Sequence, residues 1–167
     1  MGKRLLLIAI LVAIVSILYY FFYCMHYNHR YQRPAVEITY MLLDYIESNN
    51  GHFPTNEEDL VAQGYLRKNI QNQEVIYETR YGNSNSDPWG ICPNFEKFDI
   101  LYGIDVNDLN LINGKLYYKK DDIQVFLIKG PFRGSLKLYY EEMSRKLFLQ
   151  AQKLKSGEEK VELKERN

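Results

Sequence analysis

The chain has little of what an enzyme or a disulfide-stabilised protein needs. Its 167 residues include three histidines and two cysteines, Cys24 and Cys92, which are too few for a disulfide framework. The Gly-x-Ser-x-Gly, His-Glu-x-x-His, phosphate-loop and Cys-x-x-Cys motifs are all missing from the sequence. We therefore expect a protein that is not an enzyme.

Acidic residues are missing from the first 33 residues, which carry four basic residues: Lys3, Arg4, Arg30 and Arg33. The whole chain has 21 basic and 21 acidic residues, so the part after Arg33 holds 17 basic against 21 acidic side chains. This balance leaves no basic patch of the kind that binds a nucleic acid backbone. We expect no nucleic acid partner.

Charge is also missing from Leu5 to Cys24, where Ser16 is the one ordinary polar residue. At about 1.5 Å per residue, a helix of this length matches a hydrocarbon core about 30 Å thick. A buried core helix seldom runs so far without a polar face. A cleaved signal peptide is the stronger alternative, but bulky rather than small side chains follow the run. The run therefore predicts an uncleaved transmembrane helix over 5–24, with membrane lipid as its partner.

Aromatic residues gather at the end of this run, in the stretch YYFFY over 19–23 and then at Tyr27 and Tyr31. Rings with an apolar body and a polar tip favour the headgroup layer. The topology rules favour a short cytoplasmic N-terminus, over 1–4, and a large translocated domain. We predict a cell (inner) membrane protein with an extracytoplasmic domain over 25–150 and a mobile charged tail over 151–167.

The stretch CMHYNH invites a metal or haem interpretation. His26 and His29 share one face of a helix, but Cys24 points roughly opposite His26 at about 100° per residue. The three side chains therefore do not converge on a continuous helix. We favour an interfacial anchor for this stretch.

A helical pattern follows from Pro34, either as a second helix or as a continuation of the first. Apolar residues recur at three- and four-residue spacing, at Ala35, Ile38, Leu42 and Tyr45. Acidic residues lie largely away from that stripe, at Glu37, Asp44 and Glu47. We expect the stripe to be buried.

The stretch NGHFPTNEEDL predicts a joint between two helices. Asn50-Gly51 can end the first helix, because Gly adopts the left-handed conformation at low cost. Phe53-Pro54 favours an extended link, since the residue before proline avoids the helical region. Thr55 and Glu58 have the spacing of a capping box for a short helix through Leu60 that stops at Gly64.

The rest of the chain is typical of strands. We predict strands over 74–81 and 123–130, a type I turn in the loop that contains Asp87-Pro88, and a hairpin at Asn113-Gly114. Residues 136–150 are ambiguous, because they alternate as strands do and also have good helix propensity. We favour a hairpin that turns near Glu142 to Arg145 over a helix.

Three motifs in series carry a family resemblance: NGHFPTNEEDL, DPWG and KFDI. Over residues 5–108 the chain resembles the major pseudopilins of type II secretion systems. The resemblance implies an α+β fold in which the N-terminal helix packs on a small antiparallel sheet. It also implies a subunit of a pilin-like fibre, with other pilin-like subunits or a secretion platform as partners. The motif residues are Asn50, Gly51, Phe53, Pro54, Thr55, Glu58, Leu60, Asp87, Pro88, Trp89 and Gly90.

One part of the family pattern is missing. Pilin-type precursors carry a basic leader that ends in Gly, followed by an apolar helix with Glu at its fifth position. Here Lys3 and Arg4 follow Gly2, and the apolar run has no Glu. Two functional classes stay open: a component of a secretion or pilus-like assembly, and a membrane-tethered binding or sensor module that does not polymerise.

The resemblance also implies a calcium site in the loop after the FDI strand. Asp105 and Asp108 are the residues that match, and Asn107 between them supplies another hard oxygen ligand of the kind that calcium needs. The alternative is a plain acidic turn, since Asp and Asn are common wherever a chain reverses direction.

Overall fold

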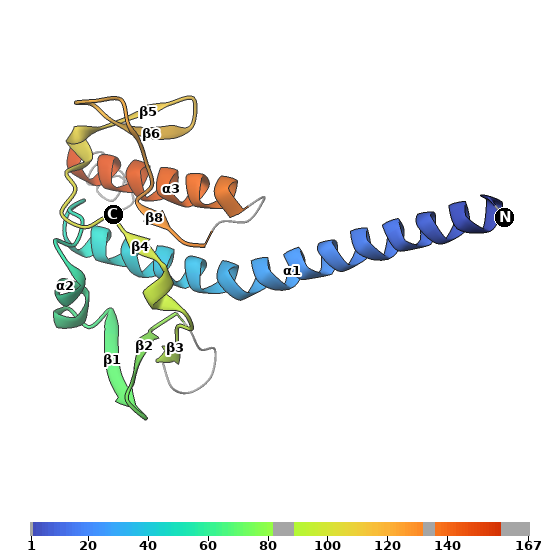
Figure 1. The fold of residues 1–167 in the computed structure, drawn as a ribbon. Coiled ribbons are helices and arrows are strands. Elements are labelled where there is room, and N and C mark those ends of the chain that lie inside the picture. The colour runs from blue at the N-terminus through green and yellow to red at the C-terminus, as the bar shows by residue number, and fades with distance from the viewer. Residues whose placement is uncertain (1, 82–88, 132–135, 158–167) are drawn as a thin grey trace, which may run out of the picture.

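The computed structural model describes residues 2–81, 89–131 and 136–157. Its dominant element is α1 (Gly2–Ser48), one continuous helix of 47 residues that contains Pro34. The N-terminal half of α1 projects from the body of the molecule, and the C-terminal half runs through it (Figure 1). The helix predicted from Pro34 onward is therefore a continuation of the apolar helix.

The other elements are short apart from α3 (Leu136–Ser156). One more α-helix, α2 (Glu57–Ala62), and two 3₁₀ turns, η1 (Phe95–Lys97) and η2 (Val106–Asp108), connect the strands. The strands are β1 (Leu66–Gln71), β2 (Glu74–Thr79), β3 (Gly90–Ile91), β4 (Asp99–Ile100), β5 (Leu109–Ile112), β6 (Lys115–Tyr118), β7 (Gln124–Val125) and β8 (Ile128–Lys129).

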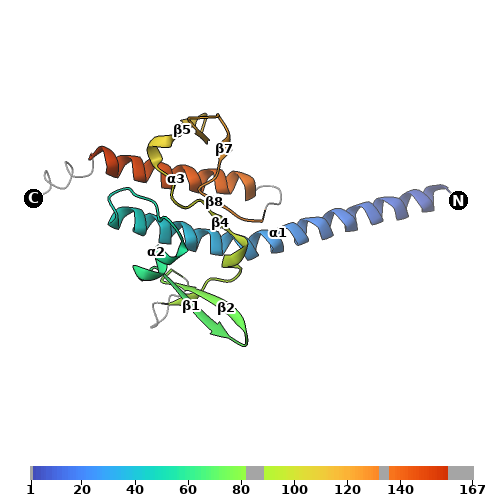
Figure 2. The same cartoon turned by 60° about the vertical axis from the view of Figure 1, so that its left-hand side comes forward.

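The strands form three small antiparallel sheets in the described part of the chain: β1-β2-β3, β4-β8 and β5-β6-β7. The β1–β3 sheet lies on the opposite side of α1 from α3 in both views (Figures 1 and 2). The fold is therefore α+β with a long apolar N-terminal helix and antiparallel pairing. The expected single sheet is replaced by three separate ones.

Helices α1 and α3 lie side by side and run parallel (Figure 2). Near the start of α3, Gln32 hydrogen-bonds the hydroxyl of Tyr139. Near its end, the Gln150 amide donates to the Glu47 carboxylate over 3.0 Å. The expected stripe on α1 is buried in the core, which confirms the helical period.

The predicted hairpin over 136–150 is wrong, because this segment belongs to α3. The residues that are buried recur with the helical period, at Tyr140, Met143, Leu147 and Ala151. Leu138 and Leu149, which supported the alternating interpretation, are exposed. The predicted tail also begins too early, since α3 continues to Ser156 and Ala151 is buried. Residues 158–167 of that tail lie outside the described residues.

The strand predictions have mixed outcomes. The Asn113-Gly114 hairpin is confirmed between β5 and β6, with positive φ angles of 50° and 78°. The strand predicted over 74–81 is confirmed over 74–79 as β2, and residues 80–81 form a turn instead. The single strand over 123–130 is instead divided between β7 and β8, in two different sheets. Strand β1 was not predicted, although the positive φ of Asn72 marks the turn that follows it.

Candidate functional site

The described side chains of the apolar half of α1 are exposed, apart from that of Cys24, which is half-buried. Leu11, Ile17 and Leu18 each expose half or more of their surface. In the described part of the chain, one helix is long and apolar enough to span a membrane, and it lies near the N-terminus. Such a surface is stable in lipid and unfavourable in water.

A ladder of aromatic rings connects this half to the core. Along α1, the ring centroids of Tyr23 and Tyr27 are 6.3 Å apart and those of Tyr27 and Tyr31 are 4.8 Å apart. The ladder continues from Tyr31 to Phe98 at 6.5 Å and from Phe98 to Tyr140 at 6.2 Å. These are ordinary spacings for interacting aromatic pairs. Because α1 is continuous, the apolar half enters the domain with no loop between them, and the ladder packs along this junction.

Gly130 allows the close packing at the end of this ladder. A Cβ atom at Gly130 would lie 2.5 Å from the Tyr140 hydroxyl oxygen and 2.6 Å from a ring carbon of Phe98. Any larger residue would push the two rings apart. The sequence carried no signal for this role.

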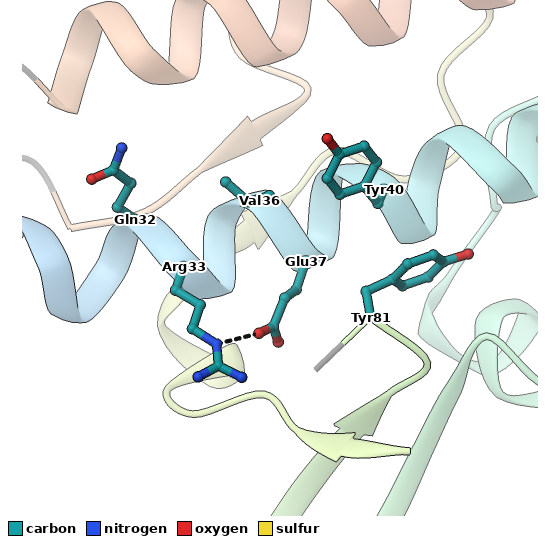
Figure 3. A pocket seen from close by; sticks show the side chains of 6 residues that line it. All are labelled: Gln32, Arg33, Val36, Glu37, Tyr40 and Tyr81. Carbon is teal, nitrogen blue, oxygen red and sulfur yellow. Dashed lines mark hydrogen bonds and ion pairs between the residues drawn. The ribbon is translucent and has the colours of Figure 1, made fainter. Parts of the chain in front are cut away.

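A groove of about 480 Å³ opens on α1 just beyond the ladder (Figure 3). Its lining comes from α1 and from the segment after β2, and consists of Gln32, Arg33, Val36, Glu37, Tyr40 and Tyr81. The rings of Tyr40 and Tyr81 stack at 6.3 Å, and the Tyr81 hydroxyl donates to the Asp44 carboxylate. Burial, followed by this hydrogen bond, raises the pKa of Tyr81.

Glu37 is the unusual residue of the groove. Its side chain is only 5% exposed, and its Oε1 accepts a hydrogen bond of 2.8 Å from Arg33 Nε. Its Oε2 is buried and meets no N–H or O–H donor among the described residues, while the Cys92 thiol hydrogen-bonds the Glu37 carboxylate. Burial, and then the negative charge of Glu37, raise the pKa of the buried Cys92 thiol. The expectation that Glu37 lies away from the buried face is wrong; the Arg-x-x-x-Glu spacing was the available signal.

The helix joint is confirmed in outline. Asn50 and Gly51 have φ angles of 52° and 83°, and the Gly51 N–H donates to the Ile46 carbonyl over 2.9 Å, as in a Schellman motif. Gly51 also meets α3, since a Cβ there would lie 2.6 Å from the carbonyl oxygen of Ala151. Phe53, Pro54 and Leu60 are buried.

The predicted capping pair of this joint is wrong by one residue. Asn56, not Thr55, is the N-cap of α2, and its side chain accepts from the Asp59 N–H over 3.0 Å. The Asp59 carboxylate takes the place predicted for Glu58, and it accepts from the backbone N–H and the hydroxyl of Thr55. The Thr55 hydroxyl bond is the largest cause that lowers the pKa of Asp59.

The two residues of the predicted calcium site lie at either end of η2. The Asp105 carboxylate caps η2 through the Asn107 N–H at 2.8 Å and accepts from Lys155 Nζ at 2.7 Å. The hydrogen bond from Lys155 is the largest cause that lowers the pKa of Asp105. Asp108 instead lines a hollow with Tyr118 and Lys119. No group of three or more His, Cys, Asp or Glu residues suited to a metal occurs among the described residues.

The DPWG motif is only partly described. Asp87 and Pro88, with their predicted turn, lie outside the described residues. Gly90 begins β3. Two guanidinium groups lie over the Trp89 ring, with their Cζ atoms 3.8 Å (Arg67) and 5.4 Å (Arg80) from the ring centroid. These contacts hold the β1–β2 ribbon against the start of β3.

Comparison with known proteins finds no matching family model, no matching curated protein and no matching solved structure. The resemblance to the major pseudopilins therefore stays a prediction from three sequence motifs.

Proposed function

We propose that this chain is a non-enzymatic, single-pass membrane protein that acts as a subunit of a type II secretion or type IV pilus-like assembly. Its N-terminus is cytoplasmic in this proposal, and its domain is displayed outside the inner membrane. The observation that carries the proposal is α1 itself, because one unbroken helix has a bare apolar half and a half that forms the spine of the domain.

This arrangement suits a subunit that is held by its helix. Assembly through the apolar half would bring domains together in one preferred orientation, because α1 passes into the domain as one helix and the aromatic ladder packs along the junction. A chain that only tethered a domain to a membrane would need no such rigid connection.

A membrane-tethered binding module is the second candidate, and the groove beside Glu37 favours it. A buried carboxylate with one oxygen that meets no N–H or O–H donor among the described residues is costly to keep. Buried charged groups that lower the stability of a protein are common at sites that bind a partner.

Cysteine cross-linking in native membranes separates the two candidates. Cys24 lies at the end of the apolar run, and Cys92 is only 2% exposed. With a bifunctional maleimide, an assembly subunit that also carries Ile10→Cys should give a ladder of multimers. The matched control with Ile10→Cys and Cys24→Ser has one reactive cysteine and should stop at dimers. Monomers alone in both variants would favour the tethered module.

A further inference from the structure

The end of the domain that faces the apolar half of α1 carries exposed basic residues and an exposed leucine. Arg30 is exposed on α1, and Lys137 and Leu138 are exposed on the first turn of α3. Leu138 exposes 69% of its surface. On each helix the first acidic residue of the domain comes later, at Glu37 and at Glu141.

These residues lie at one level because α1 and α3 run parallel. Tyr139 hydrogen-bonds Gln32, so in two parallel helices Leu138 lies at about the level of Tyr31 and Lys137 at about the level of Arg30. The start of α3 also adds the partial positive charge of a helix N-terminus to the same end. Asp99 and Lys129, which face each other across the β4–β8 pair, contribute no net charge. Among the described residues, the two helices therefore bring basic side chains and the exposed Leu138 to this end.

Distance along α1 places this end at the membrane surface. At 1.5 Å per residue, Arg30 lies about 9 Å beyond Cys24 and Leu138 about 10 Å beyond it. The headgroup layer adds about 5 to 7 Å to each side of the hydrocarbon core. Lysine and arginine side chains are long enough to cover the remaining gap.

We propose that this end of the domain, formed by Arg30, Lys137 and Leu138, docks on the anionic headgroups of the bilayer that α1 crosses. The inference rests on the membrane anchoring in the proposed function. The continuous helix sets the height of the domain, and the basic residues set its attraction to anionic lipid. Leu138 then lies against the interfacial layer instead of bulk water.

Leu149 supplies a matched reference for the test. It is exposed on the same helix, about 16 Å further from the membrane than Leu138, and three helical turns separate the two on nearly the same face. Leu138→Cys and Leu149→Cys are each made in full-length protein that carries Cys24→Ser. Buried Cys92 is left in place. An environment-sensitive fluorophore is attached to each cysteine.

The protein is reconstituted in vesicles of phosphatidylcholine with phosphatidylglycerol that contain a headgroup-attached quencher. We expect strong quenching at 138 and little at 149. Arg30→Gln with Lys137→Gln should lower the equilibrium constant for contact about thirtyfold, on the usual strength of two basic side chains at an anionic surface. Lys119→Gln with Lys120→Gln removes the same charge elsewhere and should leave the quenching unchanged.

Two failures are distinguishable in this experiment. Protein that does not float with the vesicles would overturn the anchoring on which the proposed function depends. Protein that floats but shows equal quenching at 138 and 149 would overturn the docking alone. Quenching at 138 that is the same with pure phosphatidylcholine and in the Arg30 and Lys137 variant would also overturn the role of anionic lipid.

Discussion

Residues 5–24 and residues 31–48 belong to one helix, yet they differ in almost every respect. The first stretch is apolar on all sides, and its described side chains are exposed apart from half-buried Cys24. The second has a buried apolar stripe and an exposed polar face. Helix propensity is similar in both, so propensity does not cause the difference. The first half is long and apolar enough to span a membrane, and the second half packs in the domain.

This difference predicts that membrane insertion and folding of the domain can be lost separately. A charge in the first half should affect membrane insertion and leave the domain folded. A cavity in the second half should unfold the domain and leave insertion intact. The aromatic ladder joins the halves mechanically, but it does not make their stabilities interdependent.

The largest expected effects come from substitutions that disable one half of α1 at a time. Ile10→Asp with Ile14→Asp should abolish stable membrane insertion, at about 3 kcal/mol for each buried charge. Ile38→Ala should instead destabilise the domain by about 3 kcal/mol, because Ile38 is fully buried. Vesicle flotation measures the first effect, and thermal unfolding followed by near-ultraviolet circular dichroism measures the second. If either variant lost both properties, the two halves would not be independent.

The second effect concerns the point where the packed half ends. Gly51→Ala should cost about 3 kcal/mol, since it combines backbone strain with a contact against the Ala151 carbonyl. Gly114→Ala is the matched control, because Gly114 has a φ of 78° but no atom within 4 Å of a Cβ. It should cost only about 1 kcal/mol. Equal losses of unfolding free energy in the two variants would show that the contact with α3 does not contribute to the cost of Gly51→Ala.

The third effect concerns the buried charge on the packed half. Glu37→Met should stabilise the domain by about 1 kcal/mol, because it replaces a half-satisfied buried carboxylate by an apolar side chain of similar size. Glu58→Met, at an exposed position on α2, should change the stability little. Denaturant unfolding measures both. A large loss of stability in Glu37→Met would mean that the pair with Arg33 is structurally required.

A smaller effect is expected on the stability of the domain at acid pH, from the ion pair between Asp105 and Lys155. The folded-state pKa of Asp105 is lowered, chiefly by Lys155, so its contribution is present above the unfolded pKa of about 3.9. That contribution is lost as the pH falls through the lower, folded-state pKa. Asp105→Asn should therefore lose less stability than wild type on acidification, by under about 1 kcal/mol for this exposed pair. Parallel acid-unfolding curves would contradict the assignment.

The smallest effect tests the calcium prediction. Lys155 already neutralises Asp105, so calcium should raise the melting temperature of the wild type only slightly. Lys155→Met exposes the carboxylate to competition by the ion and should increase the calcium effect. Melting with calcium, with magnesium and with chelator measures both proteins. Identical curves in all three solutions for Lys155→Met would leave Asp105 and Asp108 as an ordinary acidic turn.

Signals that depend on neighbouring residues were reliable in this sequence. Asn50-Gly51 ends α1 and Asn113-Gly114 turns a hairpin, because positive φ is a local property of these residues. The buried stripe on α1 was also predictable, since its spacing is encoded within a few turns of helix.

Features that depend on distant residues were not predictable in this way. The alternation at Leu136, Leu138 and Tyr140 is accidental, and packing on α1 decides that the segment is a helix. The buried surroundings of Glu37 include Cys92, which follows β3 and is not part of the local pattern. Gly130 is required only because Phe98 and Tyr140 meet there. The groove as a whole therefore needed the structure.

If α1 spans a membrane as proposed, its continuity sets which side of the domain faces a neighbouring molecule in the membrane plane. With no hinge between Tyr23 and Tyr31, each residue inserted between them would turn the domain about 100° around the helix axis and raise it by about 1.5 Å. The number of residues between Tyr23 and Tyr31 thus determines the rotation of the domain about the helix axis. Any surface that meets a partner alongside the membrane would be turned away from it by a single inserted residue.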